Sequence, residues 1–180
     1  MIKFSKEEKD KIIEKFNNNE LMIMETDTVY GIMAKACVEN EIKINKFKDS
    51  NIDKKISVIF PNKKTLYKYL YDISYYKKEY MDNRLPGKYT FIVKLRNFSD
   101  FSREDFGVRI TGSSYLQEIL EQVGPILASS CNKSGDTVIN SIDDIVEKFG
   151  NSDIGIVNSD KILDTPSSII NLLDDIEVVR

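Results

Sequence analysis

Short apolar segments of strand length alternate with amphipathic segments of helix length along the chain, and this alternation restricts the fold more than any other feature. Short apolar runs between turn residues are typical of buried strands, whereas apolar residues three and four positions apart form one face of a helix. Strands are predicted at 21–24, 56–60, 89–95, 106–110, 126–129, 154–157, 168–172 and 176–179. Helices are predicted from Ser5 to Asn17 and at 40–47, 61–70, 73–81, 114–123 and 141–150.

Helices separate some of these strands but not others, which argues against a purely parallel sheet. Parallel neighbours need a long crossover, usually a helix, while antiparallel neighbours can be joined directly. The 180 residues contain no internal repeat and no linker-like stretch, and they suffice for one hydrophobic core. We therefore predict a single α/β domain, residues 1–180, with a twisted, mixed parallel and antiparallel sheet flanked by helices.

The residue types that are present limit the chemistry. The sequence contains no histidine, which excludes histidine general bases, histidine metal sites and Ser-His-Asp triads. Cys37 and Cys131 are its two cysteines, and two buried thiols are favoured over one disulfide. No apolar run approaches the ~20 residues that cross a bilayer, and the charged N-terminal segment is unlike a secretory signal. We expect a cytoplasmic protein without a membrane contact.

Charge is distributed unevenly along the chain. The formal net charge is −3, yet residues 43–96 carry 14 basic and 5 acidic side chains. Such a segment can attract a polyanion such as ATP or RNA, or it can form solvated helix faces. Charge alone leaves both interpretations open.

Three polar segments coincide with predicted strands or strand ends. The segment at 26–31, TDTVYG, follows a strand and suits either a small-ligand site or an ordinary turn. Arg109 lies inside an apolar strand, where it needs a carboxylate or phosphate partner from the protein or from a ligand. The segment at 129–135, SSCNKSG, can cradle phosphate oxygens, although it has the spacing of neither a Walker loop nor a dinucleotide loop.

Together with Lys48, LPGKYTFIV at 85–93 and PSSIINL at 166–172, these segments resemble the Sua5/YrdC family. That family's pattern comprises Pro-Thr-Asp/Glu-Thr-Val-Tyr-Gly, Lys-x-Arg-Pro, Trp-Pro-Gly-x-x-Thr, Val-Arg-x-Pro, Thr-Ser-Ala-Asn-x-Ser-Gly and a late Ser-Thr pair. The resemblance covers nearly the whole chain. Because the sequence ends at Arg180, we expect the short, YrdC-like form.

The resemblance implies a YrdC/RibB-like fold around a large basic cavity. It also implies an L-threonylcarbamoyladenylate synthase, a nucleotidyltransferase that converts L-threonine, bicarbonate and ATP, with Mg²⁺, to threonylcarbamoyl-AMP and pyrophosphate. The product would serve tRNA N6-threonylcarbamoyladenosine synthesis through a downstream tRNA threonylcarbamoyl transferase. Metal ligands in the protein are not implied.

The resemblance also assigns roles to individual residues. Lys48 and Arg109 are implied to be catalytic. The threonine-binding side is implied to comprise Thr26, Tyr30, Arg109, Thr111, Ser130 and Ser168. The ATP-binding side is implied to comprise Lys48, Ser130, Asn132, Ser134 and Arg180, with Ser50 at the position of a family arginine, and we add Lys54 from the same basic loop.

Several positions depart from the family pattern. Glu25 replaces a proline, Leu85 a tryptophan, Thr111 a proline and Cys131 an alanine. In the basic loop, Ser50 replaces the arginine and Asn51 the following proline. We expect Lys54 to supply the missing charge, because a long lysine side chain can serve phosphate without fixed geometry.

Two other functions fit parts of the sequence. A non-catalytic RNA-binding module of the same fold would use the basic segment and its tyrosines to stack bases; the tyrosines are Tyr67, Tyr69, Tyr71, Tyr75 and Tyr76. A carbamoyl-adenylate enzyme, related to the hydrogenase-maturation proteins, would use carbamoyl phosphate and no threonine. Threonine dependence separates both alternatives from the synthase.

Overall fold

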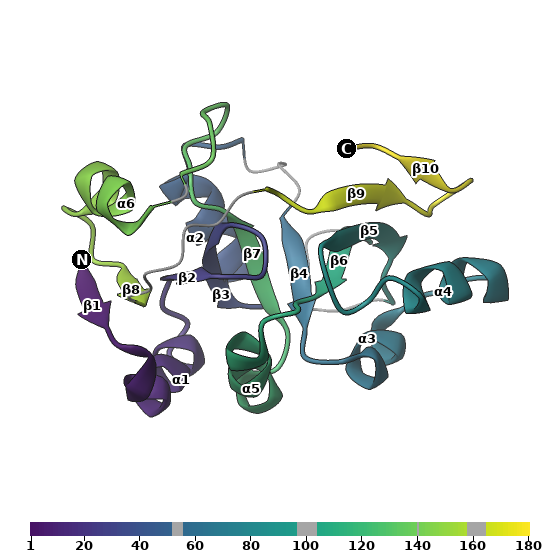
Figure 1. Ribbon diagram of the computed structural model, residues 1–180, viewed down its shortest axis with the longest axis horizontal. Helices are drawn as coiled ribbons and strands as arrows, with labels where there is room; N and C mark the ends of the chain where they lie inside the picture. Colours follow the sequence, from purple (N-terminus) through teal and green to yellow (C-terminus); the bar gives the residue numbers. More distant parts are fainter. Residues whose placement is uncertain (52–55, 97–103, 140, 158–164) are drawn as a thin grey trace.

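The computed structural model describes residues 1–51, 56–96, 104–139, 141–157 and 165–180, and these residues build one sheet (Figure 1). The strand order is β1-β8-β2-β3-β7-β4-β6-β5-β9-β10. The strands are β1 (Ile2–Phe4), β2 (Met22–Glu25), β3 (Tyr30–Lys35), β4 (Ser57–Phe60), β5 (Tyr89–Lys94), β6 (Asp105–Ile110), β7 (Ile126–Ser130), β8 (Gly155–Val157), β9 (Ser168–Asn171) and β10 (Glu177–Val178).

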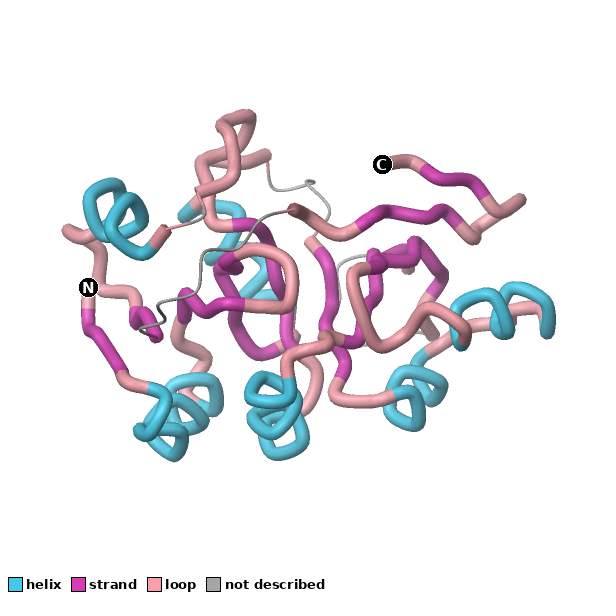
Figure 2. The backbone as a smooth tube through the Cα atoms, viewed as in Figure 1, coloured by secondary structure: helices cyan, strands magenta, loops and turns pink. Residues whose placement is uncertain are grey.

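The strands pair in both directions, as predicted. β8 pairs in parallel with β1 and β2, β4 with β6, and β5 with β9. The remaining neighbours are antiparallel: β2 with β3, β3 with β7, β7 with β4, β6 with β5, and β9 with β10. Figure 2 shows the strands in the middle of the molecule and the helices around them. The single α/β domain with a mixed sheet is therefore confirmed for the described residues.

Helices cover both faces of this sheet. They are the 3₁₀ helix η1 (Lys6–Glu8), α1 (Lys9–Asn17), α2 (Val38–Phe47), α3 (Lys63–Tyr69), α4 (Tyr75–Asp82), α5 (Ser114–Val123) and α6 (Ile142–Phe149). The apolar sides of α1 and α5 form one core layer with Met22 and Met33. Residues of α2, α3, α4 and α6 form the other core layer, which includes Ile23 and Ile32. Because successive strand residues point to opposite faces, β2 and β3 contribute to both layers.

Helix ends follow the capping residues of the sequence. The hydroxyl oxygen of Ser113 accepts a hydrogen bond from the N–H of Leu116 at 3.4 Å, and Gly124 ends α5 with φ at 87°. The hydroxyl oxygen of Ser141 accepts from the N–H of Asp144 at 3.2 Å and begins α6. Such caps satisfy backbone groups that a helix leaves unpaired. The helix predicted at 114–123 is confirmed at both ends.

Two strands were not predicted from the sequence, and four helices begin two or more residues from the predicted start: α2, α3 and α4 each begin two residues away, and α1 begins later than Ser5. β1 is short, and it exists because it pairs with β8. β3 contains Gly31 and comes directly after a polar turn, so it lacks the usual strand signals. The N–H of Ser5 donates to Glu8 at 3.0 Å, as a capping box predicts. The turn that follows is 3₁₀, and the α-helix begins at Lys9.

The two thiols are not bonded to each other. Cys131 is fully buried, as expected, whereas Cys37 is partly exposed, contrary to the prediction of two buried thiols. Within the described ranges, no helix has the length and apolar character needed to span a membrane.

Candidate active site

A cavity of about 450 Å³ lies on the face of the sheet that carries α1 and α5. Five adjacent strands each contribute to its lining: Gly31 of β3, Ala128 of β7, Ile59 of β4, Arg109 of β6 and Thr90 of β5. The 26–29 turn, the loop that follows β7 and the residues around β9 complete it. The middle of the sheet therefore forms the floor of a polar cavity.

Side-chain alternation explains which residues reach the cavity. Tyr30 belongs to the core layer on the other face, so its neighbour Gly31 faces the cavity. Ile170 belongs to that same core layer, so Ile169 and Ser167 face the cavity. The strands thus separate an apolar side from a ligand-accessible side.

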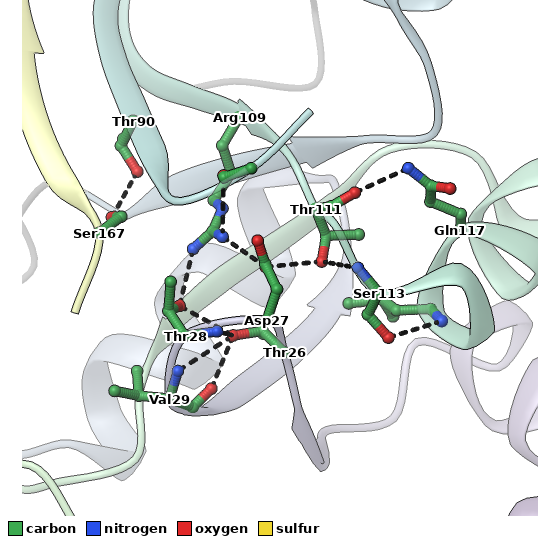
Figure 3. Close-up of polar contacts among 12 residues, drawn as sticks. Thr26, Asp27, Thr28, Val29, Thr90, Arg109, Thr111, Ser113, Gln117 and Ser167 are labelled. Carbon is green, nitrogen blue, oxygen red and sulfur yellow. Dashed lines mark hydrogen bonds and ion pairs between the residues drawn. The ribbon is translucent and has the colours of Figure 1, made fainter. Parts of the chain in front are cut away.

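The turn after β2 is closed by the hydroxyl of Thr26 (Figure 3). This oxygen accepts hydrogen bonds from the N–H groups of Thr28 and Val29 at 3.0 and 3.2 Å and donates to the carbonyl of Val29 at 2.8 Å. It also lies 2.9 Å from the hydroxyl of Thr28. Both threonines are buried and both line the cavity. Thr26 therefore shapes the turn as well as the cavity wall.

Arg109 is held by the same turn. Its Nη2 lies 2.6 Å from Oδ1 of Asp27, and its Nη1 donates to the hydroxyl of Thr28 at 3.0 Å. The two charged side chains are only 7% and 13% exposed. The hydroxyl of Thr111 donates to the same Asp27 oxygen at 2.8 Å. The partner that a buried arginine requires is thus a carboxylate of the protein, while Arg109 also lines the cavity.

Two polar atoms of this ion pair have no hydrogen-bond partner among the described residues. They are Nε of Arg109 and Oδ2 of Asp27, and both are buried. Burial lowers the pKa of Arg109, and the charge of Asp27 opposes that shift. A buried donor without a partner costs free energy. Arg109 therefore combines a counter-charge from the protein with a position on the cavity lining.

Two hydroxyls meet on the opposite wall of the cavity. Thr90 of β5 and Ser167, next to β9, lie 2.7 Å apart and are both buried. Gly107 makes room for Thr90, because a methyl group there would lie 2.9 Å from the Thr90 side chain and 3.0 Å from the Ser57 hydroxyl. Gly107 therefore leaves space for the side chains of Thr90 and Ser57, which both line the cavity.

The loop at 130–134 is held together by its own polar groups. The hydroxyl of Ser130 donates to Oδ1 of Asn132 at 2.6 Å. The amide Nδ2 of Asn132 donates to the carbonyls of Lys133 and Asp136 at 2.9 and 2.7 Å. Ser130 and Asn132 both line the cavity. These bonds give the loop the defined shape that ligand recognition needs.

The structure places three of the predicted threonine-binding side chains outside the cavity lining. Tyr30 is fully buried in the core layer on the other face of the sheet. Ser168 follows Ser167 in the chain, so its side chain points to the opposite face. Thr111 is fully buried, and its hydroxyl donates to Asp27 and accepts from the N–H of Ser113 at 3.1 Å. None of the three is a lining residue in the described structure.

Some of the predicted ATP-binding residues line the cavity and others do not. Arg180 lines the cavity, and its Nη2 donates to the carbonyl of Ser167 at 3.2 Å. Ser134 is exposed and lies in the same loop as Asn132, but it is not among the lining residues. The hydroxyl of Ser50 is buried, without a hydrogen-bond partner among the described residues. Lys54 lies outside the described residues.

Lys48 differs from its expected position. We expected its ammonium to face phosphates in the cavity. Its side chain is 2% exposed, and the ammonium donates to oxygens of Ser130 and Asn132 instead. The sequence indicates that a charge is present but not the direction in which a long side chain extends.

Several cavity residues were not predicted from the sequence. Ser57, Thr90, Ser167 and Asp136 line the cavity, and Asp27 anchors Arg109. Thr90 ends the Pro-Gly-x-x-Thr motif, so a signal was available for it. For Ser57 and Ser167 the signal is strand alternation relative to the apolar core positions.

A larger hollow of about 880 Å³ adjoins this cavity and shares Asp136 and Val138 with it. It is more open, and its ionisable lining consists of three carboxylates and Lys148. Such a lining repels a triphosphate, so we place the site in the smaller cavity, where Arg109 and Arg180 outnumber Asp136. Among the described residues, no group of three or more Cys, Asp or Glu side chains is arranged to hold a metal.

Comparisons with known proteins agree with this architecture. The sequence model of the Sua5/YciO/YrdC family, described as telomere recombination, matches residues 14–180. A Methanocaldococcus jannaschii protein, provisionally named as a threonylcarbamoyl-AMP synthase, is 30% identical over 95% of this chain and 85% of its own length.

Solved structures share the fold. Two structures of P. abyssi Sua5, one of them in complex with L-threonine, superpose with TM-scores of 0.91 and 0.84 at 18% identity. They cover 100% and 99% of this chain, which spans only 56% of the length of that protein. E. coli YciO superposes with a TM-score of 0.86 at 20% identity, over 99% of this chain and 93% of its own.

Proposed function

Because the chain belongs to the Sua5/YciO/YrdC family, we propose that it is an L-threonylcarbamoyladenylate synthase. The substrates are L-threonine, bicarbonate and ATP, and the products are threonylcarbamoyl-AMP and pyrophosphate. The related M. jannaschii protein bears the name of this activity, and L-threonine is the ligand in one of the P. abyssi Sua5 structures. The enzyme is a transferase that supplies a tRNA modification.

One observation in the site carries the proposal. Arg109 lies in the cavity wall and is oriented by Asp27 and Thr28. A guanidinium fixed in this way can bind a carboxylate with defined geometry. L-threonine supplies such a carboxylate, and the Thr90–Ser167 hydroxyl pair provides polar contacts for the rest of it.

The reaction requires little beyond positioning and neutralisation of charge. The amine of threonine attacks the carbon of bicarbonate, and water leaves as the carbamate forms. An oxygen of the carbamate then attacks the α-phosphorus of ATP, and the bond between this phosphorus and pyrophosphate breaks. Holding the reactants together and stabilising developing negative charge accounts for most of such catalysis. The chain offers Arg109, Arg180 and the polar loop at 130–134 for this purpose, and no histidine is required.

Mg²⁺ fits this site as an ion bound mainly by ATP. Mg²⁺ commonly binds through one or two carboxylates together with substrate phosphates. Asp136 is the carboxylate on the described cavity lining, although it also pairs with Lys148. When bound, the ion would neutralise phosphate charge. Lys54 remains our proposed second cation for the phosphates.

Contact with tRNA and with a threonylcarbamoyl transferase is a separate proposal. Tyr71, Tyr75 and Tyr76 are 58%, 80% and 66% exposed, as base stacking requires. Tyr67 and Tyr69 instead pack partly against the core. Salt-sensitive RNA binding that persists without ATP would support the contact, and binding that is absent at low salt would contradict it.

Pyrophosphate release tests the proposed activity. The purified protein should release pyrophosphate when given ATP, L-threonine, bicarbonate and Mg²⁺, and omission of any one should abolish release. The matched control replaces L-threonine with L-valine, which has a similar shape but lacks the hydroxyl. Release that is independent of threonine would assign another substrate, and release that requires carbamoyl phosphate would favour a carbamoyl-adenylate enzyme.

A further inference from the structure

Two lysine side chains connect the end of α2 with the loop at 130–134, each reaching into the other segment. The ammonium of Lys48, the residue after α2, donates to the carbonyl of Ser130, and to the carbonyl and Oδ1 of Asn132 at 2.7 and 3.0 Å. In the opposite direction, the ammonium of Lys133 donates to the carbonyl of Phe47, the last residue of α2, at 2.7 Å. We call these contacts the lysine clamp.

Backbone contacts and a surface ion pair reinforce the clamp. The N–H of Ser134 donates to the carbonyl of Lys48 at 2.9 Å. The ammonium of Lys133 also pairs with Asp49 at 2.6 Å and lies 5.6 Å from the centre of the Phe47 ring. The loop and the helix end therefore behave as one unit in the described structure.

The clamp uses the hydrogen-bonding capacity of Lys48 inside the protein. A lysine ammonium has three N–H donors, and three loop oxygens surround this one. Burial of an ammonium is costly unless it is hydrogen-bonded in this way. Pulling it into the cavity would remove a charged donor from all three oxygens, although Oδ1 of Asn132 and the carbonyl of Ser130 each keep one other donor. The cations on the described lining are instead Arg109 and Arg180.

Lys48 also decides how Asn132 is oriented. Oδ1 of that amide accepts from Lys48 and from the hydroxyl of Ser130 at 2.6 Å. Nδ2 is thereby directed to the carbonyls of Lys133 and Asp136. Without the ammonium, Oδ1 loses its charged donor and keeps the hydroxyl of Ser130, so the amide is held less firmly. The shape of the cavity wall at Ser130 and Asn132 thus depends on a residue that does not itself line the cavity.

We infer that Lys48 is a positioning residue, which holds Ser130 and Asn132 in place, and that it is not a ligand of the ATP phosphates. The effect of Lys48 on catalysis rests on the proposed function. The clamp itself can be tested in the free protein, without any substrate.

Cys131 provides the probe, because it lies between Ser130 and Asn132 and is fully buried. In a Cys37→Ser background, a disulfide reagent such as 5,5′-dithiobis(2-nitrobenzoic acid) reports only on Cys131. Lys48→Met should accelerate labelling by about tenfold or more, since a lost charged hydrogen bond favours local opening. The exposed Lys46, two residues earlier, gives the control Lys46→Met, which should label at the wild-type rate.

Loss of the Lys48 charge, taken by itself, would slow the labelling of Cys131 rather than accelerate it. Burial raises the pKa of Cys131 to about 12, and the charge of Lys48 lowers it. Removing that charge alone would make the thiolate scarcer and labelling slower. Accelerated labelling therefore reports opening of the loop. Amide hydrogen exchange in β5 and β6 should stay at wild-type rates, because those strands lie away from the clamp.

Several results would overturn the inference. Wild-type labelling of Lys48→Met, combined with a raised KM for ATP and a weaker salt dependence of that KM, would identify a phosphate ligand. Loss of protection in β5 and β6 would mean that the substitution unfolds the whole domain. If Lys48→Met does not fold, Lys133→Met tests the other half of the clamp and should also accelerate labelling. An inactive wild-type protein would refute the proposed function and leave the labelling result intact.

Discussion

The buried pair between Arg109 and Asp27 makes the sharpest prediction about stability. Arg109→Met leaves the carboxylate of Asp27 buried with the hydroxyl of Thr111 but without a counter-charge. Breaking a buried ion pair by removing one partner costs about 3–5 kcal/mol. For a chain of this size, each kcal/mol corresponds to roughly 2–4 °C, so the melting temperature should fall by roughly 6–20 °C.

The double variant Arg109→Met/Asp27→Asn shows whether the loss comes from the unpaired charge. Asparagine still accepts a hydrogen bond from Thr111 but carries no charge. The double variant should therefore lose less free energy of unfolding than the two single variants lose together, by about 0.5–3 kcal/mol. Urea unfolding of the four proteins measures this coupling. The reasoning is refuted if Arg109→Met is as stable as the wild type, or if the two losses simply add.

Arg109→Lys separates stability from binding. A lysine can pair with Asp27, but it lacks the fork that also reaches Thr28 and presents Nε. We expect a smaller loss of stability than in Arg109→Met and a strongly raised KM for L-threonine. A wild-type KM would contradict the role of Arg109 in binding the carboxylate.

Three further predictions concern single side chains. Ser167→Ala should raise the KM for L-threonine by about fivefold or more through loss of a polar contact, whereas Ser168→Ala, on the opposite face, should leave it unchanged; the reverse order in steady-state kinetics would contradict the assignment. Lys54→Ala should raise the KM for ATP by roughly tenfold to hundredfold, because a charge-assisted contact to phosphate is lost. Adding Ser50→Arg to that variant should lower the KM part of the way back. A wild-type KM for Lys54→Ala would contradict the proposed second cation. Burial raises the pKa of Cys131 from 9.0 to about 12, so the unfolded state releases this proton at a lower pH than the folded state does. The free energy of unfolding should therefore fall between about pH 9 and pH 12. Cys131→Ala should lack this part of the loss, and an equal slope of unfolding free energy against pH in the two proteins would contradict the prediction.

The fold was largely predictable because its signals are local. The strongly amphipathic segment at 114–123 lies between a serine cap and Gly124-Pro125, and its helix was predicted at both ends. β1 and β3 were missed for physical reasons. β1 is stabilised by its pairing with β8, and Gly31 gives β3 space rather than strand propensity. Such contacts between distant segments leave little trace in a short stretch of sequence.

The site was predictable in its segments but not in its side-chain directions. Four residues that the resemblance assigns to the substrates, Thr26, Arg109, Ser130 and Asn132, line the cavity. The resemblance implies a role for Ser168, whereas the adjacent Ser167 is the serine on the cavity lining. Only the strand register decides which of two adjacent serines faces the cavity.

The assignment of Lys48 shows the same limit for a long side chain. The resemblance implies that Lys48 faces phosphate, but the oxygens that surround its ammonium come from a loop more than eighty residues later in the chain. A sequence identifies such a charge, whereas the partners that share its space depend on the assembled fold.

The identity of the product tests the central claim most directly. The protein should be incubated with ATP, Mg²⁺, L-threonine and ¹³C-labelled bicarbonate, and the nucleotides analysed by mass spectrometry. We predict an adenylate that contains both the threonyl group and the heavy carbon, formed only when all substrates are present. An adenylate without the heavy carbon, or threonine-independent formation of AMP, would contradict threonylcarbamoyl-AMP synthesis by this chain.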